Sequence, residues 1–221
     1  MKKRILVFIT ILGAAINLNA QNIPKETPPV KYGFKGGYNL TNVEANERLS
    51  TKPISGIHIG AFVEIPISRK FSIQTEILYS NQGYKEKYQA YASADYGSVL
   101  YNFNEKLHIN YVNIPVLVKY NFTESLSMEL GPQLGFLTKA KLKGDATTGS
   151  VYMPDFSYNE DATSLIKNFE VAVAFGITYS FSDHIFASLR LNSGVTNIFK
   201  GNDVPYNITN AAMQLSVGYK F

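Results

Sequence analysis

Three histidines offer the widest range of chemistry in this chain, and they lie far apart in the sequence, at His58, His108 and His184. A serine-type hydrolase needs a histidine that contacts a nucleophile and is oriented by a carboxylate. Asp95 lies in a polar stretch before His108, but no nucleophile motif accompanies either residue. Metal sites need several ligands at compatible positions, which scattered histidines do not provide. We therefore expect no enzyme activity, no metal site and no cofactor.

Charged residues are sparse, and seven of them lie at alternate positions within otherwise apolar or small-residue stretches: Lys35, Glu64, Glu76, Glu129, Glu170, Arg190 and Lys220. Lys119 is a further candidate for this set. Ions that share the interior of a narrow fold are costly unless they are paired. The spacing predicts an internal charge network in which Arg190 pairs with Glu76. Such a network is either a salt-bridged plug or the lining of a narrow ion pathway.

The stretches that carry these charges alternate between apolar and polar residues with a period of two, which indicates β-strands with two unlike faces. Seven of these stretches are close to the roughly 9 to 11 residues that a tilted transmembrane strand requires, and one, 107–122, is longer. The sequence contains eight of them, at residues 32–40, 57–65, 71–80, 107–122, 127–136, 169–179, 185–192 and 211–221.

The fourth stretch is ambiguous, because its apolar parity shifts from Leu107, Ile109 and Tyr111 to Val112 and the residues that follow. A β-bulge near Tyr111 would repair the register and would place Pro115 at a tolerated break in the ladder. Alternatively, the strand begins only at Val112. Both interpretations remain open.

Connections between the stretches alternate in length. Short ones lie at 66–70, 121–125 and 180–184, and long ones at 41–54, 83–106, 138–166 and 193–210. This alternation predicts an all-β fold, an eight-stranded antiparallel up-and-down transmembrane β-barrel with its long loops at one end. Ten strands is the alternative count. The tyrosine-rich segment 84–103 could extend the third and fourth strands as a hairpin, contact proteins or glycans, or do both.

Two eight-stranded barrels would satisfy this pattern, a soluble cup with its apolar face inside and a membrane barrel with its apolar face outside. Charged residues make up 17% of the chain, against about 25% in typical soluble domains. The polar parity is rich in Gly, Ala, Ser and Asn, which suits a cramped interior. Aromatic residues near the strand ends suit the two membrane interfaces, and these are Tyr32, Phe71, Tyr120, Phe169, Tyr179, Tyr219 and Phe221. Both features favour the membrane barrel.

The N-terminal residues resemble a cleaved export signal, with Lys2, Lys3 and Arg4 before an apolar run that reaches about Ile16. That run is shorter than the roughly 20 residues of a membrane anchor, the alternative interpretation. We expect a signal peptide at 1–20, a periplasmic segment at 21–30 and a barrel domain at 31–221. Removing the three basic residues from a net charge of +4 leaves +1, which does not favour a nucleic-acid partner. The absence of cysteine excludes disulfides and a lipidated N-terminal cysteine.

Several motifs together resemble the small outer-membrane β-barrel family of Bacteroidetes, often called PorT-like or porin-family proteins. They are Ala20-Gln21, "FKGGYNLTN" at 34–42, "YVNIPVLVKY" at 111–120 and "LSVGYKF" at 215–221. The resemblance implies a bacterial outer-membrane location and contact with outer-membrane lipid. It also implies recognition by the outer-membrane assembly machinery through Val217, Tyr219 and Phe221.

From these features we expect a non-enzymatic barrel whose surface loops have a structural, binding or adhesion role toward an unknown ligand or envelope protein. A small pore, or a component of an envelope transport or secretion assembly, is the alternative. In the expected barrel, Lys35, Glu64, Glu129 and Lys220 lie in the periplasmic half, and Glu76 and Arg190 lie near mid-height.

Overall fold

The structure is a computed structural model that describes residues 28–45, 50–94, 97–149, 153–201 and 207–221. The predicted export signal at 1–20 lies outside these residues. In the part of the chain that is described, no helix is long and apolar enough to cross a membrane. The described residues form nine strands, which are β1 (Lys31–Ala45), β2 (Thr51–Pro66), β3 (Phe71–Ala94), β4 (Gly97–Asn121), β5 (Leu126–Thr147), β6 (Phe156–Asp161), β7 (Phe169–Ser180), β8 (Ile185–Gly194) and β9 (Ile208–Lys220).

The sheet closes on itself as an antiparallel up-and-down barrel. Eight strands form the ring in the order β1, β2, β3, β4, β5, β7, β8 and β9, and β9 returns to pair with β1 from Gly33↔Lys220 to Ala45↔Ile208. The short strand β6 pairs only with the outer part of β5. The predicted eight-stranded ring is confirmed, and the ten-stranded alternative is wrong, because β6 lies outside the ring.

The two faces of the ring differ as a membrane barrel requires. Outward side chains are apolar and exposed, for example Ile59 at 63% and Leu215 at 58% exposure, whereas the inward Glu76 and Arg190 are only 1% exposed. A soluble cup would show the reverse, because apolar side chains line its cavity and charges face water. An exposed apolar belt around a polar interior is stable only in contact with lipid.

The ambiguous fourth stretch contains the predicted irregularity at Tyr111, and the alternative start at Val112 is wrong. Strand β4 starts well before Val112, and its register against β3 is unshifted from Tyr120 to Gly97. The irregularity at Tyr111 is real, but the additional residue is Thr138 on β5, because Asn110 pairs with Lys139 and Tyr111 pairs with Leu137. Inward positions of β4 stay odd-numbered throughout, and their character changes from a mixture of polar and apolar residues, such as Lys119, Leu117 and Asn113, to the apolar Tyr111, Ile109 and Leu107.

That change of character produces an apolar cluster at the long-loop end of the lumen. The buried side chains of the cluster come from β1, β4, β5, β9 and two connections: Val43, Leu107, Ile109, Tyr111, Ala140, Ala162, Ile166, Ile198 and Ile208. Ile166 forms an isolated β-bridge with Phe199. The two connections therefore pack over the mouth of the barrel and close it with apolar side chains.

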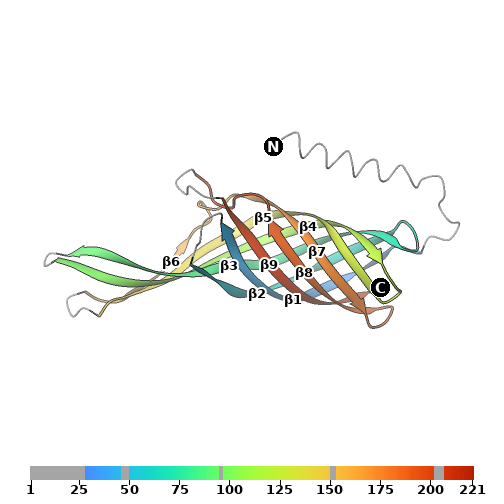
Figure 1. The fold of residues 1–221 in the computed structure, drawn as a ribbon, viewed down its shortest axis with the longest axis horizontal. Coiled ribbons are helices and arrows are strands. Elements are labelled where there is room, and N and C mark those ends of the chain that lie inside the picture. Colours follow the sequence, from blue (N-terminus) through green and yellow to red (C-terminus); the bar gives the residue numbers. More distant parts are fainter. Residues whose placement is uncertain (1–27, 46–49, 95–96, 150–152, 202–206) are drawn as a thin grey trace.

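Strands β3, β4 and β5 continue far beyond the ring, and β6 adds a fourth strand to the projecting part (Figure 1). We call this part the extension, residues 85–94, 97–106, 141–147 and 156–161. The hairpin expected for 84–103 is confirmed. The expectation that 138–166 is a loop is wrong over 139–147, which continues β5, and over 156–161, which forms β6. The C-terminal end of β9 lies at the opposite end of the molecule.

Candidate functional site

Four charged side chains form a chain of ion pairs at the centre of the lumen. Arg190 binds Glu76 with two parallel bonds, Nη1 to Oε2 at 2.8 Å and Nη2 to Oε1 at 2.7 Å, and its Nε donates to Glu129 Oε1 at 2.7 Å. Lys35 Nζ lies 3.1 Å from Glu76 Oε2. The two positive and two negative charges of this network cancel. The planar guanidinium of arginine makes the paired hydrogen bonds to a carboxylate strong.

Small residues make room for buried carboxylates in the lumen, both in this central network and at Glu170. A Cβ added to Gly176 would lie 2.8 Å from Glu129 Oε1 and 3.0 Å from the carbonyl oxygen of Leu189. A Cβ on Gly135 would meet Glu170 at 2.6 Å. Inward glycines on β5 and β7 therefore leave the volume that long carboxylate side chains need in a narrow barrel.

A second network lies nearer the short turns. Lys119 Nζ binds Glu64 Oε2 at 2.8 Å, and Ser72 donates to the other oxygen of Glu64 at 2.8 Å. Lys119 also donates to Gln74, whose amide donates to Glu76 at 2.5 Å, so the two networks are continuous. The predicted candidate Lys119 thus faces the lumen.

Two of the predicted charges lie outside these pairs. Lys220 donates to Ser180 Oγ at 3.1 Å, and its ammonium lies 5.0 Å from the centre of the Phe186 ring. Glu170 accepts a hydrogen bond from Asn210 at the outer end of the lumen. Among the described residues, neither charge belongs to a salt bridge. The structure therefore brings five of the seven predicted charges into ion pairs, and it adds Lys119.

The histidines do not form a site together. His58 is buried in the lumen, where its ring nitrogens contact Asn39 Oδ1 and Ser216 Oγ at 2.7 Å each. His108 occupies an outward position on β4, and His184 contacts the carbonyl oxygen of Lys220 near a short turn. Asp95 lies outside the described residues. In the described ranges, no group of three or more potential ligands is placed to hold a metal ion.

The proposed assembly residues lie on the outer face where the ring closes. Val217, Tyr219 and Phe221 are exposed, and the N–H of Phe221 donates to the carbonyl oxygen of Tyr32 at 2.8 Å. The ring of Phe221 stacks on Tyr32 at 5.4 Å and meets Phe34 edge-on at 6.0 Å. These rings form part of an aromatic girdle at the short-turn end.

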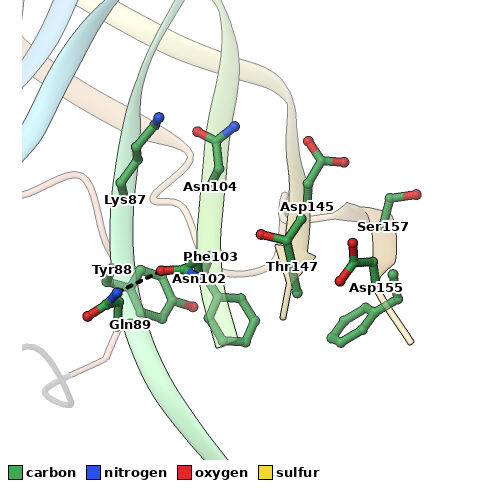
Figure 2. A pocket seen from close by; sticks show the side chains of 12 residues that line it. Lys87, Tyr88, Gln89, Asn102, Phe103, Asn104, Asp145, Thr147, Asp155 and Ser157 are labelled. Atoms are coloured by element: carbon green, nitrogen blue, oxygen red, sulfur yellow. Dashed lines mark hydrogen bonds between the residues drawn. The ribbon is translucent and has the colours of Figure 1, made fainter. Parts of the chain in front are cut away.

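The extension carries a groove of about 880 Å³ on the face that continues the outer surface of the barrel. Two rows of polar side chains flank it (Figure 2), and they are Lys87, Asn104, Asp145 and Ser157 in one row and Gln89, Asn102, Thr147 and Asp155 in the other. The row between them, from Tyr88 to Phe156, contributes backbone as the floor, because its side chains turn to the opposite face. Gln89 donates to Asn102 at 2.7 Å, which fixes part of the rim.

Aromatic rings stabilise the extension from its other face. Tyr88 and Phe103 stack at 4.9 Å with an interplanar angle of 8°, and Phe156 packs against Phe103 at 6.5 Å. The hydroxyl groups of Tyr88 and Tyr158 both donate to Glu105. Desolvation, followed by the hydrogen bond to Glu105, raises the pKa of Tyr88 to about 12, so this donor stays protonated at neutral pH.

The sequence identified only half of this groove. It marked 84–103 as a contact segment, but the wall from β5 and the residues after it was missed, because 138–166 was expected to be a loop. Phe156 and Tyr158 alternate with Ser157 and Asn159, and this short alternation is the signal that could have revealed β6.

A comparison with known protein families identifies the family of this chain. The family model described as "Outer membrane protein beta-barrel domain" matches residues 19–200. No curated protein matches the sequence. Similar solved structures include the attachment invasion locus protein Ail of Yersinia pestis in complex with the heparin analogue sucrose octasulfate, at 14% identity and a TM-score of 0.44 over 88% of this chain and 100% of that one.

Two other solved structures are similar to this chain. Neisserial surface protein A has 11% identity and a TM-score of 0.45 over 88% of this chain and 100% of that one. OprG from Pseudomonas aeruginosa has 13% identity and a TM-score of 0.38 over 86% of this chain and 95% of that one. With the family model covering most of its length, this chain belongs to the outer membrane protein beta-barrel domain family.

Proposed function

We propose that this protein is a non-enzymatic outer-membrane barrel that presents a ligand-binding surface at the cell exterior. The observation that carries the proposal is the groove of the extension, which projects beyond the barrel. Three of its four strands continue directly from the ring, and stacked aromatic rings support its other face. Sites on rigid strands hold binding groups more precisely than sites on loops.

The rims of the groove favour a hydroxyl-rich ligand such as a glycan. Amide, carboxylate and hydroxyl side chains supply both donors and acceptors along the two rows.

The lumen favours a structural role over a pore. Arg190 and its carboxylate partners fill the centre of the barrel, and the apolar cluster closes the long-loop end. Eight strands leave an interior about wide enough for side chains alone. We therefore expect no steady conductance in a planar bilayer, and a stable open level would favour the pore alternative.

Membership of the PorT-like group of Bacteroidetes is part of the same proposal. The motifs at 34–42, 111–120 and 215–221 support it. Cleavage of the export signal after Ala20 and recognition of the last strand by the assembly machinery belong to it as well.

Glycan arrays probed with the refolded protein in lipid nanodiscs test the binding role. We expect the wild type to bind a defined set of glycans, and Asn102→Trp combined with Thr147→Trp to abolish that binding by filling the groove. Asn159→Trp, on the same face of β6 but outside the groove, is the matched control and should bind normally. Binding no stronger than that of empty nanodiscs would contradict the proposal, and so would full binding by the filled-groove variant.

A further inference from the structure

A row of lysines crosses the outward face of the barrel where the extension begins. Strand register places Lys52 opposite Lys85, Lys85 opposite Lys106, and Lys106 opposite Lys143, on the adjacent strands β2, β3, β4 and β5. We call these four residues the lysine row. Lys139 and Lys141 lie on the same face of β5, on the membrane side of the row.

Such a row is unfavourable in the protein alone. Side chains directly opposite on neighbouring strands have their Cβ atoms about 5 Å apart, and like charges at that separation destabilise the pairing. Lys106 is in the worst position, because it has a lysine on each side. The arrangement therefore calls for an anion that bridges the ammonium groups.

The protein supplies few anions to this face. Among the described residues, none of these six lysines belongs to a salt bridge. Asp161 and Asp145 share the face, in the rows of residues on either side of the lysine row, and Asp161 accepts a bond from the N–H of Thr163. Glu86 and Glu105 occupy neighbouring positions but face the other side of the sheet. Positive charge on the outward face is therefore largely uncompensated.

A neighbouring group responds to this uncompensated charge. His108 occupies the outward position next to Lys106 on β4, beyond the apolar belt. Burial lowers the pKa of His108, and the positive charges of Lys143 and Lys106 lower it further. The imidazole therefore stays neutral at physiological pH and adds no charge to the row.

The position of the lysines relative to the apolar belt identifies the source of the anion. The belt ends on β4 at Val112 and on β5 at Phe136, and Lys139 is the next outward residue of the β5 ladder. Lys143 lies four residues further, which is about 13 Å along the strand and about 10 Å in height for a tilt of roughly 40°. Lipid headgroups occupy about 5 to 8 Å on each side of the hydrocarbon core, and lysine side chains bend toward them.

We propose that the lysine row, together with Lys139 and Lys141, binds the phosphate groups of phosphorylated lipids in the outer leaflet. Four ammonium groups on strands about 4.8 Å apart span about 15 Å, which suits a headgroup with more than one phosphate. The lipid would hold the base of the extension at a fixed height and would relieve the repulsion within the row. This inference rests on the membrane placement of the barrel and is independent of glycan binding in the groove.

Titration of the refolded, full-length barrel in neutral dodecyl maltoside micelles tests the proposal. The probes are diphosphorylated lipid A, the same lipid without phosphates, and its deacylated phosphosugar. The main variant carries Lys85→Gln, Lys106→Gln and Lys143→Gln. A control variant removes three cations from the short-turn end, through Lys31→Gln, Arg69→Gln and Lys70→Gln. Heat-modifiable migration in SDS gels confirms that each variant has folded.

We expect the wild type and the control to bind diphosphorylated lipid A, and the triple variant to bind it on the order of a hundredfold more weakly, since each lysine near an anionic membrane surface contributes about fivefold. Equal binding by the triple variant would overturn the proposal. Equal binding of the phosphate-free lipid would overturn it as well, and equally tight binding of the deacylated phosphosugar would assign the row to a soluble anion instead of a lipid.

A stability measurement gives a second readout whose sign depends on the lipid. In phosphatidylcholine vesicles, Lys106→Gln should slow urea unfolding or leave it unchanged, because it removes two repulsive contacts. In vesicles that also contain diphosphorylated lipid A, the same change should accelerate unfolding. An equal effect in both vesicles would contradict the proposal, and this outcome is independent of any result from glycan arrays.

Discussion

Single side chains in the lumen are held by partners on distant strands, and Arg190 is the centre of this arrangement. It joins Glu76 on β3 to Glu129 on β5, across the interior from its own strand β8. A charge buried in this way is tolerated only while its partners remain. The network therefore links β8 to β3 and β5 inside the ring, and it fills the space that water or ions would need.

Replacing Arg190 with alanine should lower the free energy of unfolding by about 3 to 5 kcal/mol. It leaves the buried carboxylate of Glu129 without its cation and that of Glu76 with Lys35 alone. Glu76→Gln in the same chain should recover part of this loss. Urea unfolding from liposomes, followed by the gel mobility of unboiled samples, measures both effects. Additive effects of the two changes would show that Arg190 and Glu76 are not coupled.

The sequence predicted residue orientation better than it predicted contacts. Period-two alternation was sufficient to assign Lys35, Glu76 and Arg190 to one face, because parity is a local property. The lysine row was not predicted, because it depends on the register between four strands. Lys85, Lys106 and Lys143 lie in segments where loops were expected, so their alignment became visible only in the structure.

At the level of elements, the inserted residue Thr138 explains why the two faces of the fifth strand exchange beyond Leu137, where a loop was expected. On β5 the side chain of Leu137 points inward, and beyond Thr138 the inward side chains are those of Ala140 and Leu142. The inward positions therefore change from odd to even numbers. A one-residue insertion of this kind exchanges the two faces of a strand. The apolar inward residues of β4 belong to the cluster at the barrel mouth. If every inward residue is expected to be polar, these residues look like evidence for a register shift within β4.

Deleting Thr138 should disrupt the extension while the lower barrel remains folded. Without it, Lys139, Lys141 and Lys143 would turn toward the apolar cluster, or β5 would lose its pairing with β4 above Tyr111. Hydrogen exchange should then increase across the outer part of β4 and across β6. Thr138→Ala is the control, since it loses only the bond to the carbonyl oxygen of Asn110 at 2.9 Å. Unchanged exchange in the deletion variant would show that the bulge does not set the register.

For the whole molecule, closure of the ring joins the two ends of the folded chain. Strands β1 and β9 pair along their length, and the aromatic rings of Tyr32, Phe34, Tyr219 and Phe221 pack together outside the seam. Closure leaves no unpaired strand edge in the ring, which lipid requires. Phe221 therefore contributes only modestly to the stability of the closed barrel, through one interfacial ring and one backbone hydrogen bond. Its larger role, in our proposal, precedes closure, when the assembly machinery recognises the last strand.

Changing Phe221 to aspartate separates these two roles. We expect a large loss of protein from outer-membrane fractions but only a small loss of stability after refolding into liposomes, because one exposed ring contributes a minor part of the folding energy. Phe221→Tyr should be mild, since an amphipathic ring remains at the interface. Lys220→Gln is the matched control, because this side chain faces the lumen and contacts Ser180. If the aspartate variant reached the outer membrane in normal amounts, the residue would be an ordinary part of the girdle. Equal losses in cells and in liposomes would instead assign it a role in stability alone.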